Sequence, residues 1–522
     1  MIIKPGVLGR FILILILPFA LQAQQSTSQK PVKTESGFVS GYFDNVNGIN
    51  IYKGIPFAAA PVGQLRWKAP QPALPWHGVK ECTVFSASPM QPKPVSFFMI
   101  GPEFVVPQSP LSEDCLYLNI WTGAHPSKEL RPVLVWIYGG GFMTGGAAAA
   151  GYSGESLAKQ GIVFVSFNYR LGVFGFLSHP DLTAESKNHS SGNYALLDQI
   201  AAIKWVKNNI RAFGGDPDKI TIAGQSAGAA SVNCLLSSPL SRGLFSGAIA
   251  ESGSLVLENP FLNMKTLAVA EKQGEQLQKK LNAKNLQELR NIPAEELQKN
   301  GSGMYSPIID GYIMPMSVAE TYRKGLQIHV PFLTGWNADE GLLFGISSKE
   351  DFAKQATGFG SDSDLFKKYF PAETDSESLS SQIAFSVDKT IGVSQYLWAV
   401  KQNENTDIRT FLYQFERKPP AEGTMKKFGA YHTAEIGYAL NNLDSIHRNW
   451  EPVDRIIEKE ISALWVQFTK TGDPNSAEKT VWPAFSASSP QAIYFGKTIQ
   501  SKPLASKAAL DFIYVHYPGK QL

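Results

Sequence analysis

Short hydrophobic runs alternate with stretches of helical spacing along most of the chain after residue 38. The runs at residues 133–138 and 162–167 are apolar at nearly every position, which predicts central strands covered on both faces. Between residues 194 and 210, apolar side chains recur every three or four positions, which predicts a helix that ends before Gly-Gly-Asp-Pro at 214–217. Further strands are expected at residues 220–223, 247–251, 330–334 and 410–415. This alternation predicts an α/β fold with a mostly parallel central sheet flanked by helices.

The chain has no internal repeat and no strong linker. A length of 522 residues favours more than one domain, but large single α/β units occur as well. Because the pattern is continuous, we expect a single domain over residues 38–522 with long insertions. Residues 262–300 are rich in Lys, Glu and Gln and are expected to form solvated surface helices. The alternating aromatic stretch at 512–517 predicts a late strand that carries His516.

The first 23 residues have the pattern of a secretory signal peptide. Lys4 and Arg10 precede an apolar run at residues 11–21, and the small residue Ala23 marks the expected cleavage site. The run is too short to cross a bilayer, so no membrane span is expected in the mature chain. The sequence therefore predicts a secreted or periplasmic protein, and residues 24–37 are expected to form a polar, disordered leader.

Composition narrows the classes of partner. Hydrophobic residues make up 43% of the chain, charged residues 18%, and the formal charge is +3. These values describe a globular protein with a large core, and they give no reason to expect nucleic acid as a partner. The sequence does not indicate an oligomeric state.

The pentapeptide Gly-Gln-Ser-Ala-Gly at residues 224–228 lies between a β-branched run and a helix-forming stretch. In that context it predicts a nucleophile elbow, with Ser226 on a sharp strand-to-helix turn. A chain with 45 glycines can also produce this pattern by chance, so a plain tight turn is the alternative. The helix that follows would point free N–H groups at a developing negative charge.

A serine nucleophile needs a base and a third group that orients the base. Of eight histidines, His432 follows an apolar strand in a loop that enters a helix, downstream of Ser226. Structural roles are expected for the other histidines, which are His77, His125, His179, His189, His329, His447 and His516. Asp339 and Glu340 follow the predicted strand at 330–334, and the spacing alone leaves the choice between them open.

The stretch Gly-Gly-Gly-Phe at residues 139–142 directly follows a predicted strand. Without side chains, such a loop lets backbone N–H groups approach a substrate oxygen. A phosphate cradle is the alternative, but no Gly-Lys-Ser/Thr follows and no acidic residue has dinucleotide spacing. No histidine or cysteine cluster has metal-ligand spacing either, so neither cofactor nor metal is expected.

Together these stretches resemble the type B carboxylesterase family, which includes carboxylesterases, cholinesterases and bacterial para-nitrobenzyl esterases. The resemblance covers nearly all of residues 36–517. Its landmarks are Tyr-Lys-Gly-Ile-Pro-Phe-Ala at 52–58, Glu-Asp-Cys-Leu-Tyr-Leu-Asn-Ile-Trp at 113–121, Trp-Ile-Tyr-Gly-Gly-Gly-Phe at 136–142, Asn-Tyr-Arg-Leu-Gly at 168–172, Phe-Gly-Gly-Asp-Pro at 213–217, and Thr-Gly-Asp-Pro-Asn at 471–475 with Trp-Pro at 482–483.

The resemblance implies an α/β-hydrolase fold and a serine esterase that acts on a small-molecule ester through an acyl-enzyme. It places the nucleophile on Ser226, the acid on Glu340 and the base on His432. The oxyanion donors fall on the N–H groups of Gly140, Gly141 and Ala227. It also implies a disulfide between Cys82 and Cys115; the third cysteine, Cys234, is expected to be a small buried apolar residue.

Two departures from the family bear on the substrate. Gln225 stands where many members carry Glu, which removes a negative charge beside the nucleophile. The loop between Cys82 and Cys115 holds phenylalanines but no tryptophan to stack on a choline ammonium, so cholinesterase activity is disfavoured. An ester with an apolar acyl or aryl part is expected. The alternatives are an amide, a thioester, a phenolic or sugar ester, or a binding module with an idle site.

Overall fold

The computed structural model describes most of the chain after residue 29. The described residues are 30–95, 101–123, 129–257, 264–301, 303–341, 345–404, 407–421, 426, 428–476 and 482–518. The predicted signal peptide at residues 1–23 lies outside them.

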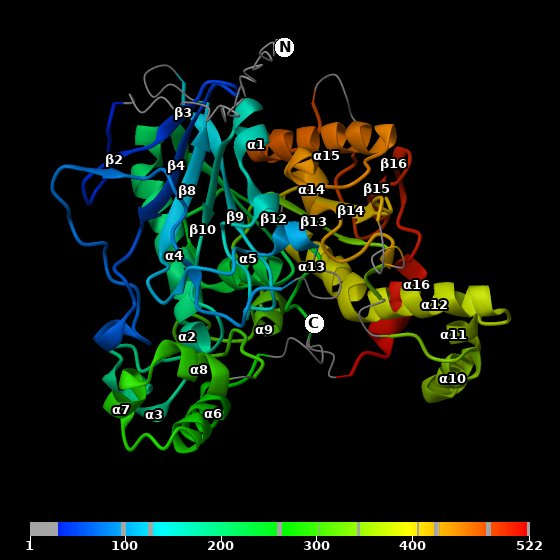
Figure 1. Cartoon of the computed structure of the whole chain (residues 1–522). Helices are drawn as coiled ribbons and strands as arrows, with labels where there is room; N and C mark the ends of the chain where they lie inside the picture. The colour runs from blue at the N-terminus through cyan, green and yellow to red at the C-terminus, as the bar shows by residue number, and fades with distance from the viewer. Residues whose placement is uncertain are drawn as a thin grey trace, which may run out of the picture.

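An eleven-stranded sheet runs through the centre of the described chain (Figure 1). Its strand order is β16-β15-β14-β13-β12-β11-β9-β10-β8-β4-β3. The run from β15 to β10 is parallel, and the outer strands β16, β8, β4 and β3 pair antiparallel. In the same order, the bounds are Ile499–Pro503, Gln491–Phe495, Thr410–Phe415, Phe332–Asn337, Gly247–Glu251, Gly215–Gln225, Arg131–Ile137, Val163–Phe167, Tyr117–Thr122, Ile49–Pro56 and Tyr42–Asp44.

The central strands are covered on both faces, as their unbroken hydrophobic runs predicted. Every residue of β10, β12 and β13 is buried. A strand that is buried on both sides has no polar face, so its sequence lacks the alternation of hydrophobic and polar residues that marks a sheet with one exposed face. The α/β fold with a mostly parallel sheet is confirmed.

Helices flank the sheet on both faces and form two outlying groups (Figure 1). Helices α6 to α8 lie at the lower end of the view in Figure 1. They fall within residues 262–300, for which surface helices were predicted. The helix bounds are α1 Glu155–Lys159, α2 Gly172–Phe176, α3 Pro180–Glu185, α4 Tyr194–Asn209, α5 Ala227–Ser237, α6 Leu267–Lys280, α7 Leu286–Asn291, α8 Ala294–Asn300, α9 Val318–Arg323, α10 Lys349–Lys354, α11 Ser363–Tyr369, α12 Asp375–Val387, α13 Val393–Asn403, α14 Ile436–Ala439, α15 Pro452–Thr471 and α16 Lys507–Val515.

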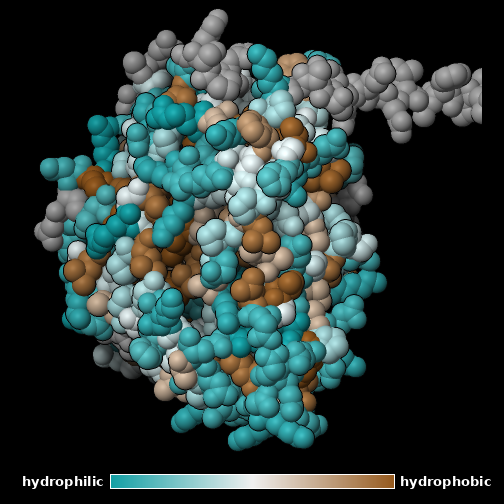
Figure 2. Space-filling model, turned by 90° about the vertical axis from the view of Figure 1, so that its left-hand side faces the viewer, coloured by the Kyte–Doolittle hydropathy of each residue, from teal (hydrophilic) through white to brown (hydrophobic). Residues whose placement is uncertain are grey.

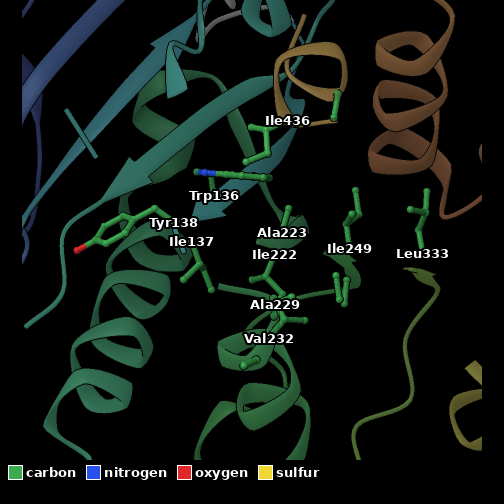
Figure 3. Close-up of a cluster of buried hydrophobic side chains, with 14 of the residues drawn as sticks. Trp136, Ile137, Tyr138, Ile222, Ala223, Ala229, Val232, Ile249, Leu333 and Ile436 are labelled. Atoms are coloured by element: carbon green, nitrogen blue, oxygen red, sulfur yellow. The ribbon is translucent and has the colours of Figure 1, made fainter. Parts of the chain in front are cut away.

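Figure 3 shows how the sheet is packed beneath the predicted elbow. Trp136 of β9 points toward Ile436 of α14 on one face of the sheet, whereas Ile137 points to the opposite face. On that opposite face, α5 contributes Ala229 and Val232, which lie against Ile222 and Ile137 in Figure 3. All of these side chains are buried. The helix that follows Ser226 is thereby fixed to the sheet by apolar contacts over its first turns.

Two small sheets lie apart from the main one. The first joins β1 (Val32–Lys33), β2 (Phe38–Ser40) and β5 (Val79–Glu81), and the second joins β6 (Ser88–Pro89) and β7 (Leu111–Ser112). The prediction of a disordered leader was wrong for its last residues, because Val32 and Lys33 pair antiparallel with Val39 and Phe38. Backbone pairing needs no hydrophobic side chains, so this polar stretch gave no sign of it.

The strand predicted at residues 512–517 was also wrong. This stretch completes helix α16, and His516 caps its carboxyl end. Leu510, Ile513 and Tyr517 are buried, which is the three-to-four-residue spacing of a helix face. The run of aromatic residues gave no clear period, and the preceding alanines favour a helix.

The predicted Cys82–Cys115 disulfide is absent from the structure, where all three cysteines are free and buried. The Cys82 thiol donates to the carbonyl oxygen of Gly54 at 3.8 Å. Burial raises the pKa of Cys82 to about 12, so this thiol stays protonated in ordinary buffers. Cys234 lies on α5 as a small buried residue, as predicted.

Figure 2 shows one face of the molecule, on which hydrophobic groups are separated by hydrophilic ones. Such scattered apolar groups are usual on globular surfaces. None of the helices in the described residues has both the length and the hydrophobicity that a membrane crossing requires.

Candidate active site

Ser226 lies at the sharp turn between β11 and α5. Its φ of 57° and ψ of −122° are unusual for a residue with a side chain. The turn is tight because Gly228 passes the neighbouring strand: a Cβ there would lie 2.0 Å from the Ile137 carbonyl oxygen. At Gly224, a Cβ would lie 2.6 Å from the Gly228 carbonyl carbon. The two glycines therefore permit the backbone contact that holds Ser226 at the end of the strand.

His432 reaches Ser226 from the loop between β14 and α14. Its Nε2 atom lies 2.8 Å from Ser226 Oγ. Both residues are partly exposed, and the imidazole side chain keeps 15% of its surface accessible. A hydroxyl that donates to a neutral imidazole and faces solvent can attack an incoming electrophile.

Glu340 supports the other side of the imidazole. It is fully buried, and its Oε2 atom lies 2.5 Å from His432 Nδ1. The second oxygen, Oε1, accepts from Ser252 Oγ at 2.7 Å and from the Asn337 backbone N–H at 2.6 Å. Three donors thus fix this carboxylate and its orientation toward His432.

The neighbouring carboxylate of Asp339 faces a different set of groups. Its Oδ2 atom accepts from the Ala430 N–H at 2.7 Å and lies 3.3 Å from Lys418 Nζ. Of the two adjacent acids whose spacing was ambiguous, Glu340 is the one that contacts His432.

The glycine loop that follows β9 lies against the elbow. A Cβ on Gly139 would lie 3.1 Å from Ser226 Cβ. Gly140 has a φ of 114°, and Gly141 has a φ of 64° with open space where a side chain would be. The N–H groups of Gly140 and Gly141 donate to no backbone carbonyl of the described residues. Ala227 begins α5, where an N–H has no partner within the helix.

Gln225 ties the histidine loop to the elbow. The side chain is buried, and its Nε2 donates to the His432 carbonyl oxygen at 2.5 Å. A glutamate at this position could not donate that bond when ionised. Gln225 therefore differs from Glu in two ways: it carries no negative charge, and it donates a hydrogen bond to the loop that holds His432.

Sequence reasoning missed Ser252 and Asn337, which hold Glu340. Ser252 directly follows β12, which lies between β11 and β13 in the sheet. Gln225 pairs with Glu251, and Glu251 pairs with Gly335, so β11 and β12 end side by side and β13 runs two residues further, to Asn337. Only the strand order would have drawn attention to the end of β12.

No group of three or more potential metal ligands occurs among the residues that the structure describes. Ser226, His432 and Glu340 form one hydrogen-bonded chain.

A family model of carboxylesterases matches residues 28–513 of the chain. The protein belongs to the carboxylesterase family. Among curated relatives, this carboxylesterase is 35% identical to fumonisin B1 esterase of Sphingopyxis macrogoltabida, with 89% of this chain and 86% of the relative covered. It is 33% identical to para-nitrobenzyl esterase of Bacillus subtilis, with 91% and 97% covered.

Solved structures give the same result for this carboxylesterase. A carboxylesterase of Geobacillus stearothermophilus superposes with a TM-score of 0.78 at 31% identity, over 93% of this chain and all of that one. The carboxylesterase therefore has the α/β-hydrolase fold, and it is a serine hydrolase of carboxylic esters.

Proposed function

We propose that Ser226, His432 and Glu340 are the catalytic triad of this esterase. The observation that carries the proposal is the continuous chain of hydrogen bonds from Ser226 Oγ through both imidazole nitrogens to Glu340. The nucleophile and base are accessible, whereas the acid is buried. This combination presents a reactive hydroxyl and keeps the orienting carboxylate away from water.

In the first half-reaction, Ser226 Oγ attacks the ester carbonyl carbon while His432 Nε2 takes the hydroxyl proton. Glu340 stabilises the resulting imidazolium through Nδ1. The tetrahedral intermediate collapses to an acyl-enzyme, and the departing alkoxide takes the proton from Nε2. Water then attacks the acyl-enzyme in the same way, and its proton passes through His432 back to Ser226.

The oxyanion of each intermediate would be held by the N–H groups of Gly140, Gly141 and Ala227. Their availability and the position of the glycine loop against Ser226 support this assignment. Loss of a single donor in such sites typically lowers the rate by ~10²–10³. The reaction needs no cofactor.

The proposed substrate is a small carboxylic ester with an apolar acyl or aryl part. In support of this, Gln225 beside Ser226 is neutral and offers no charge for a cationic substrate. Amides, thioesters and phenolic or sugar esters are the alternatives, and a panel that pairs each ester with its amide would separate them.

Stopped-flow hydrolysis of para-nitrophenyl esters with increasing acyl length tests the triad. We expect a nitrophenol burst equal to the enzyme concentration, followed by slower turnover, and no burst in Ser226→Ala. Ser237→Ala is the matched control, because Ser237 is a buried serine of α5 whose hydroxyl bonds only to its own helix at Asn233. It should keep the burst.

Equal turnover in Ser226→Ala and the unchanged enzyme would overturn the assignment of the nucleophile. Failure of folded enzyme to react at Ser226 with an organophosphonate would favour the binding-module alternative instead.

We also propose that residues 1–23 are a signal peptide and that residues 38–522 form one catalytic domain of a secreted or periplasmic enzyme. The basic start, the apolar run and Ala23 support the first part. Expression of the full chain in an exporting host should give a mature protein that begins at Gln24 by intact mass. An unprocessed chain in the exported fraction would contradict the cleavage site.

A further inference from the structure

Two further carboxyl groups lie buried behind Glu340. Glu251 ends strand β12, and Glu435 precedes helix α14, three residues after His432. Glu251 is fully buried and Glu435 is 2% exposed. Neither residue takes part in the reaction described above. The role inferred for them here rests on the proposed triad.

Each of the two carboxyls has one oxygen with a donor and one without. Glu251 Oε1 accepts from the Trp465 indole N–H at 2.7 Å, and Glu435 Oε2 accepts from Asn337 Nδ2 at 2.5 Å. Among the described residues, Glu251 Oε2 and Glu435 Oε1 have no hydrogen-bond partner. Glu340, by contrast, has three donors on its two oxygens. Because hydrogen bonds to a carboxylate stabilise its ionised form, Glu251 and Glu435 have less to support a charge at their depth.

The geometry of the sheet brings a tyrosine hydroxyl into the same cluster. Glu251, Gly335 and Tyr413 lie in one row across β12, β13 and β14. Gly335 leaves space for the Tyr413 ring, since a Cβ there would lie 2.4 Å from it. The Tyr413 hydroxyl is buried and has no partner among the described residues. Uncompensated polar atoms at this depth indicate that protons, not charges, occupy the cluster.

We propose that Glu251 and Glu435 are positioning residues that stay protonated in the working enzyme, so that Glu340 carries the only negative charge behind His432. Neutral Glu435 holds the Asn337 side chain, and the Asn337 backbone N–H holds Glu340. Glu435 thus acts on the imidazole through Asn337 and Glu340 without touching it, and neutral Glu251 adds no charge to the cluster around them.

The surroundings of the pair support this protonation. Burial raises the pKa of Glu251 to about 8, and burial together with Glu251 and Glu340 raises that of Glu435 well above its usual value. The titratable groups that interact with the pair are Glu340 after β13, Tyr413 of β14, Tyr152 before α1 and Tyr431 beside His432. Three like charges in one buried cluster would oppose one another, and this repulsion is removed when two of the three carboxyl groups keep their protons.

Infrared spectroscopy tests the protonation without reference to activity. The pH 7 minus pH 10 difference spectrum of the full enzyme should contain the carbonyl stretch of buried carboxylic acids. This band should weaken in Glu251→Gln and in Glu435→Gln and be weakest in the double variant, where the buried Asp388, whose pKa burial raises to about 8, still contributes. A spectrum that is unchanged by both substitutions would overturn the proposal.

Kinetics test the positioning role. Glu435→Gln keeps a neutral group of the same shape and should lower kcat by less than about tenfold. Glu435→Ala removes one of the two acceptors of the Asn337 amide, the other being the Tyr431 carbonyl oxygen, and should lower kcat by about 10- to 100-fold with little change in KM. The midpoint of the acid limb of kcat/KM should stay the same in Glu251→Gln and Glu435→Gln, because neither substitution removes a charge.

A clear shift of that midpoint to lower pH in either glutamine variant would show that the residue was ionised, and the proposal would fail. A wrong assignment of the triad would give a different result. The unchanged enzyme would then show no burst that depends on Ser226, whatever the infrared spectra show.

Discussion

At the scale of single residues, two adjacent acids differ completely in what they contact. Glu340 is buried and lies on His432, whereas Asp339 binds the Ala430 N–H and the exposed Lys418. We therefore expect Glu340→Gln to lower kcat by about 10²–10⁴, because the amide cannot stabilise the imidazolium and can fix the wrong tautomer. Asp339→Asn should stay within about tenfold of the unchanged enzyme, because its interactions do not reach the imidazole. Steady-state kinetics on one ester give both numbers.

Thermal unfolding of the two variants serves as the control, since each should retain a cooperative transition. The reverse ranking, with Asp339→Asn the more damaged enzyme, would move the acid of the proposed triad by one position.

At the scale of elements, the elbow depends on the contact between α5 and β9. A methyl group on Gly228 would lie 2.0 Å from the Ile137 carbonyl oxygen, so the helix or the strand must move. We expect Gly228→Ala to reduce the free energy of unfolding by ~1–3 kcal/mol and to abolish the burst. Urea unfolding and stopped-flow measurements on one preparation give both values.

The matched control is Gly358→Ala. Gly358 is exposed and has nothing within 4 Å of an added Cβ, so this variant should keep its stability and its burst. A Gly228→Ala enzyme as stable and active as this control would contradict the tight elbow.

Prediction of elements from sequence succeeded where a single period dominated. The strands expected at 247–251 and 410–415 match β12 and β14 at both ends, because a continuous apolar run bounded by polar residues has one interpretation in a buried sheet. The strand predicted at 512–517 was wrong because six residues of mixed aromatic character fit both the two-residue period of a strand and the 3.6-residue period of a helix. The packing of Leu510 and Ile513 into the core favours the helix.

At the scale of the whole molecule, a buried acid makes stability depend on pH. The pKa of Glu251 rises from 4.5 to about 8 on burial, so the folded state keeps a proton that the unfolded chain releases. Its contribution is fully present below about pH 4.5 and is lost as the pH rises through about 8. The free energy of unfolding of the unchanged enzyme should therefore fall relative to Glu251→Gln between those values.

Urea unfolding of both proteins at pH 4.5, 6.5 and 8.5 checks this. Groups that titrate in the same way in both proteins contribute equally to both free energies of unfolding, so the difference between the proteins isolates Glu251. A difference between the two proteins that is constant across these pH values would show that Glu251 ionises normally in the folded state.

The sequence by itself determined the α/β class, most of the central strands and the sharp turn around Ser226, and it singled out His432 as the candidate base. These follow from local order: hydrophobic periods, glycines at a turn and the position of a residue after a strand are all written in neighbouring residues. The resemblance to a family then indicated Glu340 as the candidate acid, whereas the Cys82–Cys115 disulfide that it also implied is absent from the structure.

Only the tertiary structure decided which groups stand behind the imidazole. Ser252, Asn337, Glu251 and Glu435 come from three separate parts of the chain. They meet because β11, β12, β13 and β14 are adjacent, with Gln225, Glu251, Gly335 and Tyr413 in one row near the carboxyl ends of the strands. Strand order and register are set by packing between segments that lie far apart in sequence. The protonation of a buried acid depends in turn on how many donors that packing supplies, which no local pattern records.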